Sequence, residues 1–219
     1  MDDRSSLWCI YVVMRTILTI SIFIISLGQT SAQTMRDVWL SMPDTIVPYL
    51  DAFNRFAMIE AFEKEDGTSV TGKLQESSCI DMLTTEYMSV LLNSASTMQM
   101  RLLPTNADTV VCVVRTFYAP QAESEIAFYS TRWEKLSQSF VERVEPNRFF
   151  RRPETMSESR FAELVSIWKD CMMVRATLDA VEPVLILQCS SPIATRDEQK
   201  EIQAALVQIS LKWNGKSFN

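Results

Sequence analysis

The sequence contains no histidine and few glycines. Only four of its 219 residues are glycine, against roughly 15 at an average frequency of about 7%. The lack of histidine excludes a Ser-His-Asp triad, a Cys-His dyad and any metal site with a histidine ligand. With glycine only at positions 28, 67, 72 and 215, the chain also has no glycine-rich phosphate loop and no dinucleotide-binding fingerprint.

Basic residues are also few relative to acidic ones. Lys and Arg number 21 and Asp and Glu number 27, which gives a formal net charge of -6 at pH 7. Nucleic-acid binding depends on Lys and Arg that neutralise phosphates, so we expect no nucleic-acid partner. Because no motif for a cofactor, a metal or a catalytic set is present, we predict none of the three.

The first 32 residues are typical of a signal peptide. Arg15 supplies a positive charge before an apolar run at residues 16–28, and small residues precede a cleavage point after Ala32. This segment predicts an exported protein of the periplasm or cell envelope. After cleavage we expect no membrane association.

Two questions about this leader stay open. Translation starts at Met1 or at Met14, which is also a conventional start. A single membrane anchor is the rival interpretation, but Arg15 interrupts the longer apolar stretch that begins at Trp8, and a spanning helix needs about 20 apolar residues without a charge. Cleavage after Ala32 would leave residues 33–219, a length that suits one large domain or two small ones.

The middle of the chain is rich in predicted strands. Short apolar or alternating runs occupy residues 87–92, 97–103, 109–118 and 125–129. At this spacing, with turn residues between them, they predict an antiparallel meander. In the second run Met98 and Met100 alternate with Gln99 and Arg101, as expected for a strand with two different faces.

Helices are predicted before and after these strands. Apolar residues spaced by three and four predict a helix over residues 44–64 with Asp44 as its N-cap. A second helix is predicted at residues 157–169, with a capping box of Thr155 and Glu158. The remaining predicted elements are strands at 172–178, 184–189 and 209–213 and a helix whose apolar stripe includes Ile202 and Ala205.

Together these patterns predict an α+β fold, with an antiparallel meander sheet and helices packed on one of its faces. The predicted organisation is a signal peptide at 1–32, an N-terminal helix-plus-sheet half at 33–145, a linker at 146–156 and a C-terminal helix-plus-sheet half at 157–219. The two halves are similar in plan, and whether they arose by duplication stays open. One compact domain at 33–219 is the alternative.

Several short motifs also occur in a characteristic order. They are SMPDTIVPYL at 41–50, NR at 54–55, MRLLP at 100–104, VCVVRT at 111–116, ESEIAFYS at 123–130 and KWNGK at 212–216. In this order they resemble a family of small exported Bacteroides-type proteins with no assigned function. The resemblance implies an exported α+β domain with a signal peptide, and it brings no catalytic residues.

The most informative polar cluster is a stretch rich in arginine and phenylalanine. Phe149 and Phe150 are followed directly by Arg151 and Arg152, and Arg and aromatic residues are enriched in protein-binding hot spots. These four residues are the candidate binding site. The alternative is a linker whose phenylalanines pack on the core while its arginines stay in water.

The leading functional hypothesis is a non-enzymatic exported binding or interaction protein, whose partner would be another envelope or extracellular protein. One alternative is a small-ligand carrier, which a cavity of about 300 Å³ with converging polar groups, between sheet and helices, would favour. Another is a hydrolase that works without histidine, which two carboxylates about 5–9 Å apart would favour. The oligomeric state and the disulfide state of Cys79, Cys112, Cys171 and Cys189 stay open.

Overall fold

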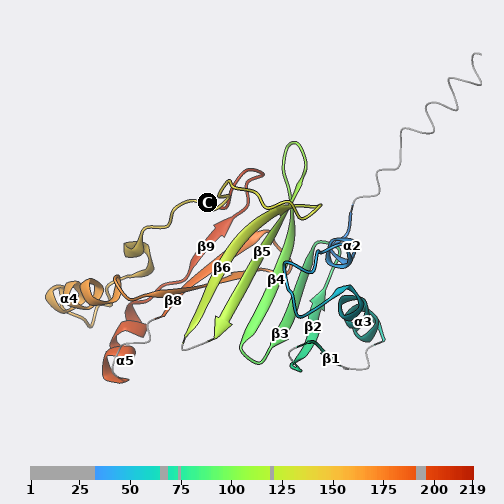
Figure 1. Ribbon diagram of the computed structural model, residues 1–219. Coiled ribbons are helices and arrows are strands. Elements are labelled where there is room, and N and C mark those ends of the chain that lie inside the picture. The colour runs from blue at the N-terminus through green and yellow to red at the C-terminus, as the bar shows by residue number, and fades with distance from the viewer. Residues whose placement is uncertain (1–32, 65–68, 74, 119–120, 191–195) are drawn as a thin grey trace, which may run out of the picture. The chain divides into compact units, whose positions relative to one another are not determined.

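The largest element of the fold is a six-stranded antiparallel sheet in which each strand pairs with the next along the chain (Figure 1). The computed structural model describes residues 33–64, 69–73, 75–118, 121–190 and 196–219, so the expected signal peptide lies outside the described residues. The strands are β1 (Val70–Thr71), β2 (Ser77–Leu83), β3 (Tyr87–Asn93), β4 (Ser96–Pro104), β5 (Thr109–Tyr118) and β6 (Ala122–Ser130). The four predicted strands of the meander are confirmed as β3 to β6, whereas β1 and β2 were not predicted.

A second, smaller sheet has three antiparallel strands in the order β7, β8, β9. They are β7 (Met173–Leu178), β8 (Val184–Ser190) and β9 (Ile209–Lys212), which confirms the three strands predicted in this region. After β9 the chain turns at Gly215, whose φ of +88° favours glycine. This turn brings Phe218 back beside Trp213, and both side chains pack in the core of the small sheet.

The helices are α2 (Met35–Leu40), α3 (Ala52–Glu63), α4 (Glu158–Trp168), α5 (Arg196–Ala205) and the short 3-10 helix η1 (Pro146–Phe149). Two of them, α3 and α4, begin later than the capping patterns predict. The prediction that Asp44 caps the first long helix is wrong, because Asp51 is the N-cap of α3 and accepts a hydrogen bond from the Asn54 N–H at 3.0 Å. A helix from 44 would place Pro48 beyond its first turn, where the missing N–H breaks a helical hydrogen bond.

A similar shift occurs at α4. Ser157, rather than the predicted Thr155, is its N-cap, and the Ser157 hydroxyl accepts a hydrogen bond from the Arg160 N–H at 3.3 Å. Pro153 precedes this region, and the N–H of Met156 donates to its carbonyl oxygen, so a turn occupies the residues where the capping box was expected.

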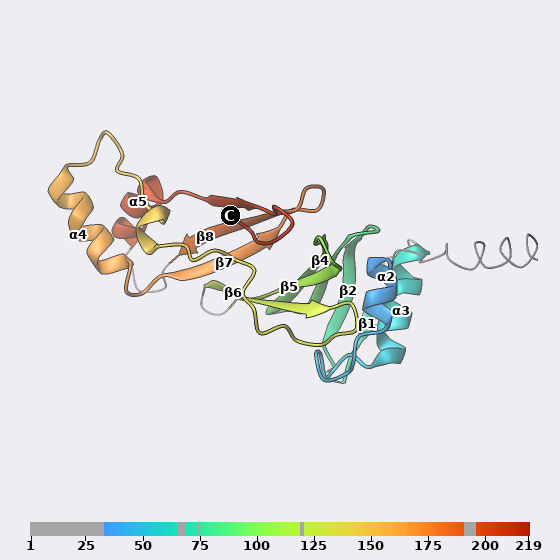
Figure 2. The same cartoon turned by 90° about the horizontal axis from the view of Figure 1, so that it is seen from above.

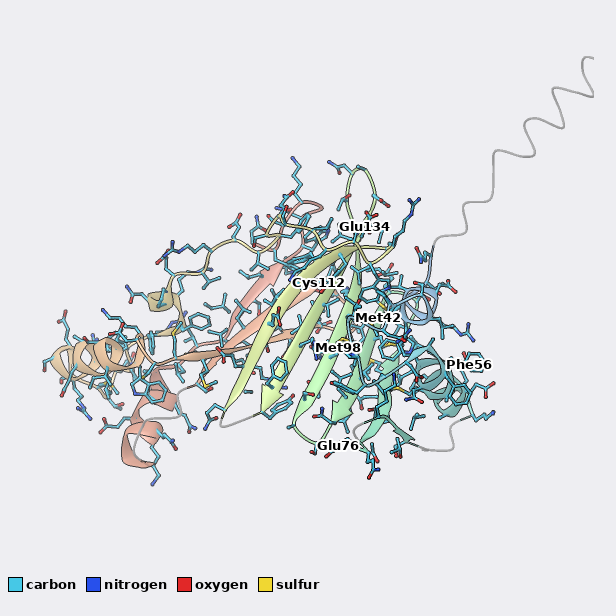
Figure 3. All side chains as sticks on the ribbon, in the orientation of Figure 1. Met42, Phe56, Glu76, Met98, Cys112 and Glu134 are labelled. Atoms are coloured by element: carbon cyan, nitrogen blue, oxygen red, sulfur yellow. The ribbon has the colours of Figure 1, made fainter. Side chains whose placement is uncertain are left out.

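Two separate cores cover the two faces of the large sheet. Helices α2 and α3 pack on one face, where Met42 and Met98 (labelled in Figure 3) are both buried, while Phe56 of α3 is 46% exposed. The small sheet packs on the opposite face of β4, β5 and β6 (Figure 2). The predicted α+β fold with helices on one face of a meander sheet is confirmed for α2 and α3, and the other face is covered in part by β7 to β9.

A third, smaller core lies between α4 and α5. Leu164 and Trp168 of α4 are buried with Ile202 and Ala205 of α5. The predicted apolar stripes of both helices therefore pack on each other. In Figure 1 these two helices lie at the end of the small sheet, far from α2 and α3.

Candidate functional site

A cleft lined by both polar and apolar residues lies where the small sheet meets the large sheet. Its volume is about 360 Å³, with strands β2 to β5 on one side and β7 on the other. The lining residues are Cys79, Asp81, Ser89, Val90, Leu91, Thr97, Gln99, Thr116, Tyr118, Arg175, Ala176 and Thr177. Polar side chains from strands that are far apart in the sequence therefore converge on one space.

The alternation of side chains along β4 explains how polar groups reach the cleft. Met98 points into the core beneath the helices, whereas its neighbours Thr97 and Gln99 line the cleft on the opposite face of the strand. Farther across the same face, Val114 and Phe128 are buried against the small sheet. The face that receives the small sheet is thus apolar around Val114 and Phe128 and polar around Thr97 and Gln99.

Two polar side chains of the large sheet hold the outer edge of β7. The Oε1 of Gln99 accepts a hydrogen bond from the Leu178 N–H at 2.9 Å, and its Nε2 donates to the Tyr87 hydroxyl, also at 2.9 Å. The Oγ of Ser124 accepts from the Ala176 N–H at 2.9 Å. Because a free strand edge exposes unpaired N–H groups, these bonds fix β7 in place and occupy the positions where another strand would add.

A buried arginine makes the next connection between the sheets. Arg101 is only 3% exposed, and its Nη1 and Nη2 donate to the carbonyl oxygens of Asp179 at 2.7 Å and Val181 at 2.9 Å. Glu86 lies 3.6 Å from the same guanidinium. The hairpin between β7 and β8 is therefore anchored to β4, and this anchor defines one end of the contact between the sheets.

Opposite charges stand on the two sides of the cleft. Asp81 lies at a β-bulge, where the pairing of β2 with β3 shifts register between Ile80 and Met82, and its Oδ2 accepts a hydrogen bond from the Ser89 hydroxyl at 2.8 Å. Arg175, on β7, is half-buried with its guanidinium 5.9 Å from the centre of the Tyr118 ring, at cation–π distance. The cleft therefore offers one carboxylate and one guanidinium to a ligand.

Comparison with protein families assigns the chain to one family. The sequence profile described as "Protein of unknown function (DUF3256)" matches residues 27–218. The chain belongs to the DUF3256 family. The expected resemblance to a family of unknown function is thereby confirmed, and the family supplies no catalytic or binding residues for this member.

One solved structure has the fold of this DUF3256 chain. It is described as "Structure of a domain of an uncharacterized protein from Porphyromonas gingivalis W83", with a TM-score of 0.67 at 18% identity. The similarity covers 84% of this chain and 96% of the other. At this identity the match shows a shared fold alone, and its organism, a Bacteroidetes member, fits the Bacteroides-type family expected from the motifs. No curated protein matches the chain.

The four predicted binding residues of the DUF3256 chain lie in different surroundings. Phe149 is 2% exposed and belongs to the core of the small sheet, while Phe150 is half-buried and packs against the core between α4 and α5. Arg151 and Arg152 are exposed, and the Nη1 of Arg152 donates to the Met156 carbonyl at 2.9 Å. The structure thus leaves the two guanidinium groups, and not the two rings together, available at the surface.

The cysteines of the DUF3256 chain differ in how deeply they are buried. Cys79, Cys112 and Cys189 are free thiols in the structure. Cys112 is completely buried in the large sheet, and this burial raises the pKa of its thiol strongly. Burial, together with the nearby Cys171, raises the pKa of Cys189 to about 11. Cys112 and Cys189 are therefore mainly in the thiol form, and not in the reactive thiolate form, at neutral pH.

Membrane-spanning helices and metal sites are both absent from the residues that the structure describes. Within residues 33–219, apart from the undescribed gaps, no helix is long and apolar enough to cross a membrane. Nor does the described part of the chain bring three Cys, Asp or Glu side chains together in a group that could hold a metal ion. The cleft is therefore the most developed site that the described residues offer.

Proposed function

We propose that this protein is an exported, non-enzymatic binding protein that holds a small polar ligand in the cleft between its two sheets. The observation that carries the proposal is the convergence of polar side chains on a space of about 360 Å³. Sites for small molecules are concave and contain a few well-placed polar groups. The cleft lies between the two sheets, whereas the carrier hypothesis expected a cavity between sheet and helices.

The cleft is also preorganised for binding. Gln99 is held at both ends of its amide, and the Ser89 hydroxyl is directed to Asp81. Side chains that are already fixed lose little conformational entropy when a ligand arrives, which favours affinity. Fixed polar groups at the base of a cleft therefore support recognition of a particular small molecule.

The chemistry of the lining residues favours binding over hydrolysis. Asp81 is the single carboxylate among them, whereas a hydrolase of the glycosidase type uses two carboxylates. Ser89 lies beside Asp81, but its hydroxyl donates to that carboxylate on one side of an open cleft without a lysine or histidine to act as a stronger base. A binding role requires none of these missing groups.

Ligand binding in the cleft is tested by thermal denaturation in the presence of polar small molecules. The probes are free amino acids, short peptides, sugars, organic acids and nucleosides, each at millimolar concentration. A ligand that binds only the folded protein raises its unfolding temperature, so at least one probe class is expected to do so. Absence of a shift with every class would overturn the proposal.

A variant that fills the cleft supplies the matched comparison. Thr177→Trp places an indole at the lining of the cleft, while Thr85→Trp makes the same change at an exposed turn between β2 and β3. The first variant is expected to lose the ligand-induced shift and the second to keep it. Circular dichroism without ligand establishes that both variants fold. An unchanged shift in Thr177→Trp would place the ligand elsewhere.

Export is the second part of this proposal. The charge at Arg15, the apolar run at 16–28 and the small residues before Ala32 support cleavage after Ala32 and residence in the periplasm or cell envelope. Expression of the full chain followed by N-terminal sequencing is expected to give a protein that starts at Gln33. Ala32→Arg should block this cleavage, and an uncleaved wild-type protein would contradict the assignment.

A protein partner is the second candidate function. It is favoured by the exposure of Arg151 and Arg152, since guanidinium groups bind carboxylates in a bidentate geometry. The partner would be another envelope or extracellular protein with an acidic surface. Capture from envelope extract by the wild type, but not by the Arg151→Glu, Arg152→Glu double variant, would support this role, and equal capture by both would reject it.

A further inference from the structure

The two charges of the cleft have unused binding capacity. A guanidinium has five N–H donors, yet within the described residues the guanidinium of Arg175 makes no hydrogen bond and no ion pair, only the contact with the Tyr118 ring. Its half-buried position at the cleft leaves these donors available to an anionic group. A carboxylate fits the planar guanidinium best, because two parallel N–H···O bonds form at once.

Asp81 offers the opposite chemistry. Its Oδ2 accepts one hydrogen bond, from the Ser89 hydroxyl at 2.8 Å. A carboxylate has about four acceptor positions, and in the described part of the chain no Lys or Arg forms an ion pair with this one. The Asp81 carboxylate can therefore receive an ammonium group or other strong donor from a ligand.

The surface between these charges is neutral. Thr97 and Gln99 line it with polar groups, while Leu91 (39% exposed) and the Tyr118 ring (41% exposed) present apolar area. Such a floor accommodates a short, partly apolar backbone with polar groups. Its volume of about 360 Å³ suits a molecule no larger than a short peptide.

From this arrangement we infer that the ligand is a small zwitterion, a free amino acid or a short unblocked peptide, whose carboxylate binds Arg175 and whose ammonium group binds Asp81. The inference rests on the proposed function, because it takes the cleft as the ligand site. The protein's net charge of -6 disfavours a ligand that carries only negative charge. A longer extended chain is also disfavoured, since Gln99 and Ser124 already occupy N–H groups along the edge of β7.

The test compares three forms of one dipeptide. Alanyl-leucine carries both charges, its N-acetyl derivative lacks the ammonium group, and its C-terminal amide lacks the carboxylate. Each is titrated into the ¹⁵N-labelled protein in the form that its cells export, and the backbone amides of the cleft are followed by NMR. Alanyl-leucine is expected to shift the amides of Gln99 and Thr177, and each blocked form to bind at least about tenfold more weakly.

Variants of Arg175 and Asp81 test which end of the ligand each residue binds. Arg175→Gln is expected to weaken the binding of alanyl-leucine about tenfold and to leave the binding of its amide unaffected. Asp81→Asn is expected to weaken the binding of alanyl-leucine by a similar factor and to leave the binding of the N-acetyl form unaffected. Arg148→Gln and Asp170→Asn make the same charge changes at exposed positions outside the cleft and should change nothing. If Arg175→Gln fails to fold, Arg175→Lys keeps the charge, loses the bidentate geometry and should still weaken binding.

The outcomes separate this inference from the proposed function. Equal binding of the three dipeptide forms in the cleft would overturn the zwitterion and leave the proposed function in place. The zwitterion would also be overturned, and the proposed function kept, if another probe class bound in the cleft while alanyl-leucine and all free amino acids did not. Absence of binding by every probe class would overturn both the inference and the proposed function.

Discussion

The Nη1 of Arg101 donates a hydrogen bond to the carbonyl oxygen of Asp179 at 2.7 Å, which joins the large sheet to the turn that follows β7. A second bond from the same guanidinium reaches the Val181 carbonyl. The ion pair with Glu86 adds little, because Glu86 is 64% exposed and water screens the interaction. Arg101 therefore acts chiefly as a buried donor to backbone carbonyls, and it fixes the position of the β7–β8 hairpin.

Removal of this donor should destabilise the protein. Arg101→Ala is expected to lower the free energy of unfolding by about 2–4 kcal/mol, since it leaves two carbonyl oxygens without their donor and a cavity where the side chain packed. Urea denaturation measures the change. Arg143→Ala is the control, because its ion pair with Glu145 is exposed on both sides and should contribute less than about 0.5 kcal/mol. Equal losses in the two variants would contradict the role of Arg101.

The strands were predictable where the sequence carries a clear period. The runs that became β3 to β6 alternate or are uniformly apolar, and hydrophobic periodicity is a local signal that survives folding. Strand β2 was missed because Ser77 and Ser78 begin it and Asp81 interrupts it, so no alternation is visible. Its bulge at Asp81 reflects pairing with β3, which only the folded sheet supplies.

The cleft was not predictable for a different reason. Alternation on β4 places Thr97 and Gln99 opposite Met98, and this signal indicates a polar face. It does not reveal what covers that face, because the bond between Gln99 and Leu178 joins residues 79 positions apart. The same limit applies to Phe149, which sits in an arginine-rich stretch typical of a surface and yet is buried by distant strands.

Stability should depend on the ionisation of Asp179. Its Oδ1 accepts hydrogen bonds from the N–H groups of Glu182 and Val181, both at 2.8 Å, and these bonds hold the pKa of the carboxyl below its usual value. A carboxyl with a depressed pKa in the folded state stabilises the fold above its unfolded pKa, near 3.8, and loses this effect as the pH falls through the lower folded pKa.

Asp179→Asn tests this dependence, because the amide keeps an acceptor oxygen but does not ionise. The variant is expected to be less stable than the wild type at pH 7, with the difference shrinking below pH 3.8 as the wild-type carboxyl becomes protonated. Thermal denaturation of both proteins across this range gives the result. A difference that stays constant with pH would show that the charge of Asp179 does not contribute.

The stretch Phe149 to Arg152 should divide into a structural and a surface part. Phe149→Ala removes a ring that is 2% exposed and is expected to cost about 3–5 kcal/mol. The double variant Arg151→Glu, Arg152→Glu changes exposed guanidinium groups and should shift stability by no more than about 1 kcal/mol. Urea denaturation compares the two. A large loss in the double variant would mean that these arginines hold the fold, and its partner capture could then not be interpreted.

The cysteines should differ in reactivity according to burial and thiolate content. Iodoacetamide reacts with thiolates, so in the native, reduced protein Cys79, which is half-buried, is expected to react before Cys189, whose pKa is raised to about 11. Cys112 should react only after denaturation, because the reagent does not reach a fully buried side chain.

Mass spectrometry of peptides after timed labelling at pH 8 gives the order of reaction of the cysteines. The labelling rate at Cys189 should rise about tenfold per pH unit below its pKa. Labelling of Cys112 as fast as Cys79 in the folded protein would contradict the burial of Cys112 in β5. The same labelling without the reductant reports which of the four thiols are paired in the purified protein.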